Sequence, residues 1–209
     1  SVGGDKSKDS SEGGSVGVFL RKGKLTLEAC AISSAEGTGV ALGDDWDSRS
    51  TRTFFIANCH IGPCGRHGML LNPCAEKIII KKVVIFAVEQ CAIGNNSADA
   101  AITDCVISTS QDGLRMNSLS RDNEVTLLDS RITNCIGTAT NCLSTAIKNT
   151  ATLTLTGCTI EKCKVALEVN GGTAKIVVDK TNSVKDCTDA NVIKNGGQLI
   201  SSEANMQQD

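Results

Sequence analysis

Short segments in which apolar and polar residues alternate recur along the whole chain, and the clearest copy spans residues 152–170. In this copy Leu153 and Leu155 alternate with threonines, Cys158 follows, and a second apolar strand ends at Asn170 before two glycines. Period-two alternation with turn residues at regular offsets predicts short β-strands instead of helices. Copies repeated every twenty to forty residues or so predict a solenoid.

The copies align on a small or thiol-bearing residue that precedes an apolar residue by two places. The first aligned column contains Cys30, Cys59, Cys91, Cys105, Ser130, Cys158 and Asn182. Five residues further on, the second column contains Ala35, Cys64, Asn96, Ser110, Cys135, Cys163 and Cys187. Cys91 and Cys105 lie closer together than other neighbours, so either the segment 100–102 serves two strands or one of these cysteines does not belong to the column. The alignment predicts about six full coils, with seven as the upper count.

Equivalent strands of successive coils would pair in parallel, with like residues stacked on like residues. This pattern resembles the right-handed parallel β-helix of the pectin-lyase-like superfamily. We therefore expect an all-β fold, with a flexible Gly/Ser-rich leader over 1–15, the β-helix over 16–200 and a polar tail over 201–209. Neither end carries a recognisable cap, so we expect a piece of a longer protein or a subunit whose solenoid ends are covered by partner proteins.

The composition narrows the possible functions. Apolar residues make up 40% of the chain but aromatic residues only 2%, which favours a narrow interior of branched and small side chains. The net charge of -2 is interspersed along the chain, so we expect no nucleic-acid partner. No apolar run approaches the roughly 20 residues that a membrane-spanning helix needs, and we expect no membrane span. No cofactor-binding motif is recognisable, and we expect no cofactor.

The chain has 11 cysteines, an odd number that leaves at least one thiol unpaired in a monomer. Neighbouring positions of a column would lie about 4.8 Å apart, within the Cα range that a disulfide bridges. This predicts a disulfide between Cys163 and Cys187, with Cys64–Cys74 and Cys135–Cys142 as local alternatives; the other interpretation is a reduced ladder that fills space.

The cysteines bear on metal binding and on location. The chain has no C-x-x-C pair and only two histidines, so we expect no metal site. An extracellular or cell-surface location is favoured, although a reducing compartment would keep the same thiols as small buried hydrophobes.

The loop around residues 43–52 gathers three aspartates and the single tryptophan: Asp44, Asp45, Trp46 and Asp47. Clustered carboxylates could hold Ca²⁺ or act as acid and base, and a tryptophan could stack on a sugar ring. These residues are the candidate ligand-binding site. The alternative is a solvated loop with internal ion pairs.

Polygalacturonases of the same superfamily carry a Gly-His-Gly turn, paired aspartates and an Arg-Ile-Lys strand. The segment Arg66-His67-Gly68 is similar to the first of these motifs, and Arg115 aligns with the start of the last. The chain departs from the pattern because no Asn-Thr-Asp triplet occurs and no lysine lies two places after Arg115. If the chain is an enzyme, the resemblance implies that His67, Asp112 and Arg115 are catalytic.

Two functions follow from these observations. The favoured one is a non-catalytic β-helix that acts as a structural, adhesive or binding element, with partner proteins at its ends or a glycan on its face. The alternative is a polysaccharide hydrolase or lyase of the pectin-lyase-like type. An enzyme should bring two carboxylates, or a carboxylate and a base, together in an outward groove within about 10 Å.

Overall fold

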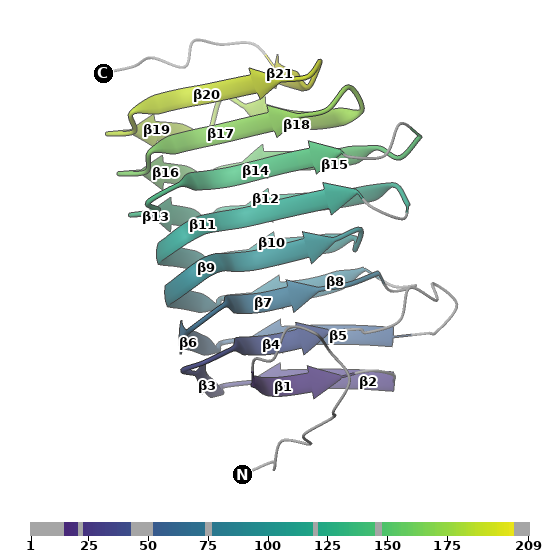
Figure 1. The fold of residues 1–209 in the computed structure, drawn as a ribbon, viewed down its shortest axis with the longest axis vertical. Coiled ribbons are helices and arrows are strands. Elements are labelled where there is room, and N and C mark those ends of the chain that lie inside the picture. The colour runs from purple at the N-terminus through teal and green to yellow at the C-terminus, as the bar shows by residue number, and fades with distance from the viewer. Residues whose placement is uncertain are drawn as a thin grey trace.

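The computed structural model describes residues 15–20, 23–42, 52–73, 77–118, 121–144 and 148–202. All of the regular elements in these ranges are β-strands, which form an 8-stranded and a 13-stranded sheet. Figure 1 shows the coils stacked in chain order from the N-terminal to the C-terminal end. The prediction of an all-β parallel solenoid of six to seven coils is confirmed, with about seven coils present.

The 8-stranded sheet takes one strand from each of seven coils, with β21 as an additional strand after the seventh, and every pairing in it is parallel. Its strands, in spatial order, are β2 (Gly23–Glu28), β5 (Arg52–Ala57), β8 (Ile78–Lys81), β10 (Ala100–Thr103), β12 (Asn123–Leu128), β15 (Ala151–Thr156), β18 (Ala174–Asp179) and β21 (Gln198–Ser202).

The 13-stranded sheet has two rows of strands, joined because β9 (Val84–Asn96) and β11 (Val106–Ser118) bend and run through both. The first row also contains β3 (Ala31–Ser34), β6 (His60–Cys64), β13 (Arg131–Thr133), β16 (Thr159–Glu161) and β19 (Ser183–Lys185). The second row also contains β1 (Val16–Leu20), β4 (Thr38–Leu42), β7 (His67–Leu71), β14 (Thr138–Ser144), β17 (Val165–Asn170) and β20 (Asp189–Lys194).

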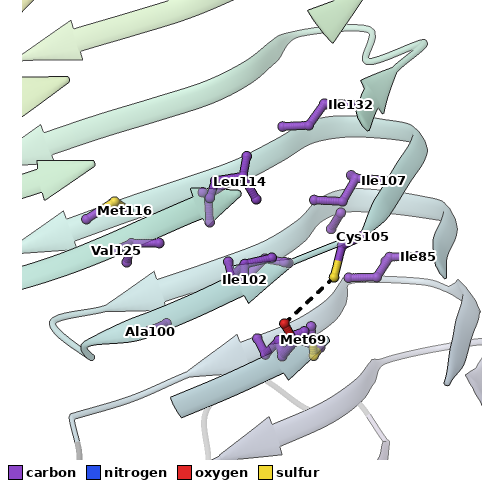
Figure 2. Close-up of a cluster of buried hydrophobic side chains, with 14 of the residues drawn as sticks. Met69, Ile85, Ala100, Ile102, Cys105, Ile107, Leu114, Met116, Val125 and Ile132 are labelled. Atoms are coloured by element: carbon purple, nitrogen blue, oxygen red, sulfur yellow. Dashed lines mark hydrogen bonds between the residues drawn. The ribbon is translucent and has the colours of Figure 1, made fainter. Parts of the chain in front are cut away.

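The interior is a continuous column of branched side chains, because residues at equivalent positions stack from coil to coil. Ile85, Ile107 and Ile132 occupy one such position on three successive coils, and all three are fully buried. Figure 2 shows these side chains together with Met69, Leu114 and Met116, and with the Cys105 thiol, which makes a 3.9 Å contact to the carbonyl oxygen of Ile80. The interior is therefore filled mainly by branched and small side chains, as the scarcity of aromatic residues predicts.

The second row approaches the isoleucine column so closely that only a very small residue fits opposite it. A Cβ atom on Gly68 would lie 2.6 Å from Cγ2 of Ile85, and one on Gly113 would lie 2.9 Å from Cγ2 of Ile132. Both distances are shorter than real Cβ contacts, so these glycines are required for the coil cross-section.

The first column of the alignment needs one correction. Backbone bonds from His60 N to Cys30 O, from Val84 N to Cys59 O and from Val106 N to Val83 O show that Val83, not Cys91, follows Cys59. Cys91 instead lies in the second row, in register with His67 and Asp112. Of the two explanations for the close pair Cys91 and Cys105, the second is thus correct.

The second column also changes at two coils, where Ser34 and Val88 pair with Cys64 in place of the expected Ala35 and Asn96. β6 has one more residue than β3 between these pairs, a bulge at Gly62 and Pro63 that shifts the first of these positions by one residue. The expected leader and tail fall almost wholly outside the described residues, although β21 extends to Ser202, into the segment assigned to the tail. Their flexibility stays a prediction.

Candidate functional site

A row of polar side chains crosses neighbouring strands of the second row and contains two of the three residues that sequence motifs single out as catalytic. The row comprises Asp112, Arg115, Thr138, Glu168 and Lys194, and we call it the polar row. Its strands β11, β14, β17 and β20 pair in parallel and lie side by side in Figure 1. The solenoid therefore brings together residues that are far apart in the sequence.

Asp112 and Arg115 form an ion pair, with 2.6 Å between Oδ2 of Asp112 and Nη2 of Arg115. The other carboxylate oxygen of Asp112 accepts a hydrogen bond of 2.9 Å from the backbone N–H of Thr138. Asp112 can approach this coil because residue 137 is glycine: a Cβ there would lie 2.5 Å from Oδ1. The hydrogen bond to Asp112 raises the pKa of Arg115, which keeps the guanidinium charged.

Glu168 forms the second half of the row. Its Oε1 accepts a 2.9 Å hydrogen bond from Nζ of Lys194, and its Oε2 accepts a 3.4 Å hydrogen bond from the hydroxyl of Thr138. Thr138 therefore links two carboxylates, and each carboxylate has its own cation. The formal charges of the polar row sum to zero, because each carboxylate is matched by one cation.

His67 occupies the same column as Asp112 but lies two rungs away, with Cys91 between them. Two rungs correspond to about 9.6 Å between Cα atoms. The imidazole of His67 lies beside Gly94, since a Cβ on Gly94 would be 3.6 Å from Nδ1 of the ring. Of the three residues predicted to be catalytic, the structure thus brings Asp112 and Arg115 into contact and places His67 a full rung beyond Cys91.

The intervening Cys91 is completely buried, and its thiol lies 3.1 Å from the carbonyl oxygen of Ile93. Burial raises the pKa of Cys91 to about 12, although the positive charge of Arg115 acts in the opposite direction. A thiol with such a pKa is almost wholly protonated at neutral pH and is a poor nucleophile. Cys91 therefore belongs to the packing of this corner.

The best-placed of the predicted disulfides is the one between Cys163 and Cys187. Cys163 and Cys187 lie on neighbouring rungs, as the alignment predicts, and the backbone N–H after Cys187 bonds to the carbonyl of Cys163. All of the described cysteines are free thiols in the structure. The Cys163–Cys187 disulfide therefore stays a prediction, for which the backbone geometry is suitable.

The two local alternatives have less suitable surroundings. Cys142 lies in β14, and its thiol is 3.4 Å from the carbonyl oxygen of Ala151, whereas Cys135 lies beside Cys163. Cys64 is in register with Ser34 and Val88, and its expected partner Cys74 lies outside the described residues. Both disulfides stay untested predictions.

Two further pairs of neighbouring thiols are absent from the predicted disulfides, although both pairs occur in the aligned columns. Cys30 lies beside Cys59 on the next rung, and Cys135 lies beside Cys163. The alignment contains the signal for these contacts, because successive cysteines of one column lie on neighbouring rungs.

A further group of carboxylates, absent from the sequence predictions, lines an open hollow at the start of β12 and β15. Asp99 accepts a 2.7 Å hydrogen bond from the N–H of Glu124, and Asp122 accepts a 2.6 Å hydrogen bond from the N–H of Thr150. These carboxylates therefore fix the turns between coils. Within the described ranges, no group of three or more His, Cys, Asp or Glu residues is arranged to hold a metal ion.

Asp44, Asp45, Trp46 and Asp47 lie outside the described residues, so their role in ligand binding stays a prediction. In the part of the chain that the structure describes, no helix has the length and apolar character to cross a membrane.

Comparison with known proteins supports the architecture. A family model described as "Right handed beta helix region" matches residues 9–182. No curated protein and no solved structure matches the chain.

Proposed function

Because the chain belongs to the family of right-handed β-helix regions, we propose that it is a non-catalytic β-helix that acts as a structural, adhesive or binding element. The observation that carries this proposal is the state of the polar row. Asp112 and Glu168 are each held by a cation and by Thr138, and His67 lies two rungs away from Asp112. A general acid and a general base need one proton-accepting group and one proton-donating group that face the substrate, and here both carboxylates face the protein's own donors.

The end coils support a role in assembly. Interior-facing residues are fully buried in the middle of the solenoid but only partly buried at its ends, where Leu25 and Leu27 lie in β2 and Val184 and Leu199 lie near the C-terminal end. Ile193 continues the interior column of Val169 and is 52% exposed. Exposed strand edges with apolar interior are the usual surfaces on which solenoids stack. We propose that a protein covers the last coil, and that the first coil of a second copy can do so.

Self-association tests this proposal without any need to know the natural partner. We expect the full chain to associate with increasing concentration in sedimentation velocity, and the Ile193→Lys variant to need at least about tenfold higher concentration for the same association. A lysine at this position would bring a charge into the stacked interface. Ile136→Lys is the matched control, because Ile136 is 72% exposed and lies midway along the solenoid.

Three results would contradict end-to-end assembly. The first is a wild-type chain that stays monomeric over the whole concentration range. The second is an Ile193→Lys variant that associates like the wild type, and the third is an Ile136→Lys variant that loses association to the same extent as Ile193→Lys. A glycan bound to the polar row is the other binding mode consistent with a non-catalytic role, and because the row has no net formal charge it favours neutral sugars over acidic ones.

The alternative function is a polysaccharide hydrolase or lyase, and one observation favours it. Thr138 hydrogen-bonds to both Asp112 and Glu168, so the two carboxylates lie within about 10 Å of each other, close to the separation in inverting glycosidases. In this reading, substrate would have to displace Arg115 or Lys194 from a carboxylate. The side chains of both cations are partly exposed, at 41% and 52%, so they are accessible to a ligand.

A further inference from the structure

Four residues at one position of successive coils form a column of sulfur and oxygen atoms near the C-terminal end of the solenoid. These residues are Ser110, Cys135, Cys163 and Cys187, and we call them the thiol column. Their register is fixed by backbone bonds from Ile136 N to Ser110 O (3.0 Å), from Lys164 N to Cys135 O (3.3 Å) and from Thr188 N to Cys163 O (3.2 Å). Each residue therefore lies directly beside the next one along the solenoid axis.

The side chains of the column contact one another in the same order. The Ser110 hydroxyl lies 3.5 Å from the Cys135 sulfur, and the Cys163 thiol makes hydrogen bonds with both Cys135 and Cys187. Successive rungs are about 4.8 Å apart, inside the range of Cα separations that disulfides adopt. Cys163 thus has two neighbours within bridging range, one on each side.

We propose that the thiol column is a site of oxidative modification, in which Cys163 forms a disulfide with either Cys187 or Cys135. A sulfur atom takes part in only one disulfide, so the three thiols give one disulfide and one remaining thiol. Within this column, the sequence predicts only the Cys163–Cys187 bridge, and it pairs Cys135 with Cys142 as a local alternative. The geometry adds Cys135 as a second, equivalent partner of the same central residue.

The oxidant that we assign to this chemistry is a peroxide. Cys187 is the half-exposed member of the column, whereas Cys135 and Cys163 are 2% and 3% exposed. The Cys187 thiolate attacks one peroxide oxygen and becomes a sulfenic acid, and with hydrogen peroxide the second oxygen leaves as water. The Cys163 sulfur then attacks the Cys187 sulfur, the S–O bond breaks and a second water leaves. In total, two thiols and one hydrogen peroxide give one disulfide and two waters.

The disulfide can then move along the column by exchange. The Cys135 thiolate attacks the Cys163 sulfur, the Cys163–Cys187 bond breaks and Cys187 leaves as a thiolate, with no net oxidation. Stacking along one axis places the attacking, central and leaving sulfurs in sequence, as this displacement requires. Hydrogen bonds from Cys163 and Ser110 lower the pKa of Cys135, whereas donation to Cys135 raises the pKa of Cys163. Cys135 is therefore the member best suited to act as the attacking thiolate.

The opposite end of the solenoid provides an internal comparison. Cys30 and Cys59 lie on neighbouring rungs, Cys30 is half-exposed and Cys59 is buried. The next member of their column is Val83, so this pair has no third thiol. Substitution of Cys30 or of Cys59 therefore removes the only disulfide that this pair can form. In the thiol column, by contrast, one disulfide can still form after substitution of Cys135 or of Cys187.

Peptide mapping of the full chain after treatment with hydrogen peroxide tests the proposal. The wild type is expected to yield both Cys163–Cys187 and Cys135–Cys163 peptides, with the second increasing after catalase removes the peroxide. Cys187→Ser is expected to give only Cys135–Cys163, and Cys135→Ser only Cys163–Cys187. Cys163→Ser is expected to lose both while the Cys30–Cys59 bridge still forms.

Circular dichroism checks that each variant folds. If Cys163→Ser does not fold, the peptide map of the wild type alone tests whether Cys163 forms disulfides with Cys187 and Cys135. The proposal is overturned if Cys163 stays reduced in wild-type protein while Cys30–Cys59 forms. It is also overturned if wild-type protein forms the Cys163–Cys187 disulfide but yields no Cys135–Cys163 peptide after catalase has removed the peroxide, because Cys135 would then not be a partner of the central thiol.

Discussion

Replacement of Ile107 by alanine is expected to lower the free energy of unfolding by about 2 to 5 kcal/mol. Ile107 is fully buried, and it stacks between Ile85 and Ile132 on the neighbouring coils. Removal of its side chain would leave a cavity that the stacked backbones on both sides cannot close, because their ladder hydrogen bonds fix the spacing of the coils. Urea denaturation followed by circular dichroism gives the difference between variant and wild type.

The matched control for Ile107 is Ile79→Ala. Ile79 lies on the outer face of β8 with 45% of its surface exposed, so its loss should change stability by no more than about 0.5 kcal/mol. Equal effects of the two substitutions would mean that the isoleucine column is not the core of the solenoid.

The Gly113→Ala variant is expected to be less stable than the wild type by about 1 to 3 kcal/mol, although alanine is normally preferred to glycine in ordered structure. The added Cβ would lie 2.4 Å from the carbonyl oxygen of Ala139 and 2.9 Å from Cγ2 of Ile132. The first contact is to backbone on the next coil, so relief requires two coils to move apart. Thermal unfolding of the variant and of the wild type measures this loss of stability.

Gly172→Ala provides the corresponding control in an exposed turn. A Cβ on Gly172 would have only the carbonyl oxygen of Asn195 nearby, at 3.9 Å. We expect this variant to unfold within about 0.5 kcal/mol of the wild type. A Gly113→Ala protein as stable as Gly172→Ala would contradict the close approach of the second row to the isoleucine column.

The repeat pattern predicts the architecture well because the same physical requirement acts on every coil. Each coil needs apolar residues at the inward positions of its strands, and these positions recur with period two inside the strands. Cys91 is the instructive error. The alignment favoured a cysteine, whereas the position requires only a small or medium apolar residue two places before an isoleucine, and Val83 with Ile85 satisfies this requirement.

The polar row is much harder to predict. Asp112 and Arg115 are three residues apart on one strand, so their proximity is visible locally. Thr138, Glu168 and Lys194 come from three other coils, and their meeting depends on coil lengths that vary along the chain. The outward position of Glu168 in β17 is the only local signal of its role.

The most direct test of a non-catalytic role is a search for products from polysaccharides. Wild-type chain and the double variant Asp112→Asn with Glu168→Gln are incubated with polygalacturonic acid and with a neutral glucan, and released oligosaccharides are measured by mass spectrometry. We expect equal, background-level release from both proteins, because the two carboxylates serve to hold the coils together. Release by the wild type at least about tenfold above the double variant, a barrier difference of about 1.4 kcal/mol, would contradict this account and establish the polar row as an active site.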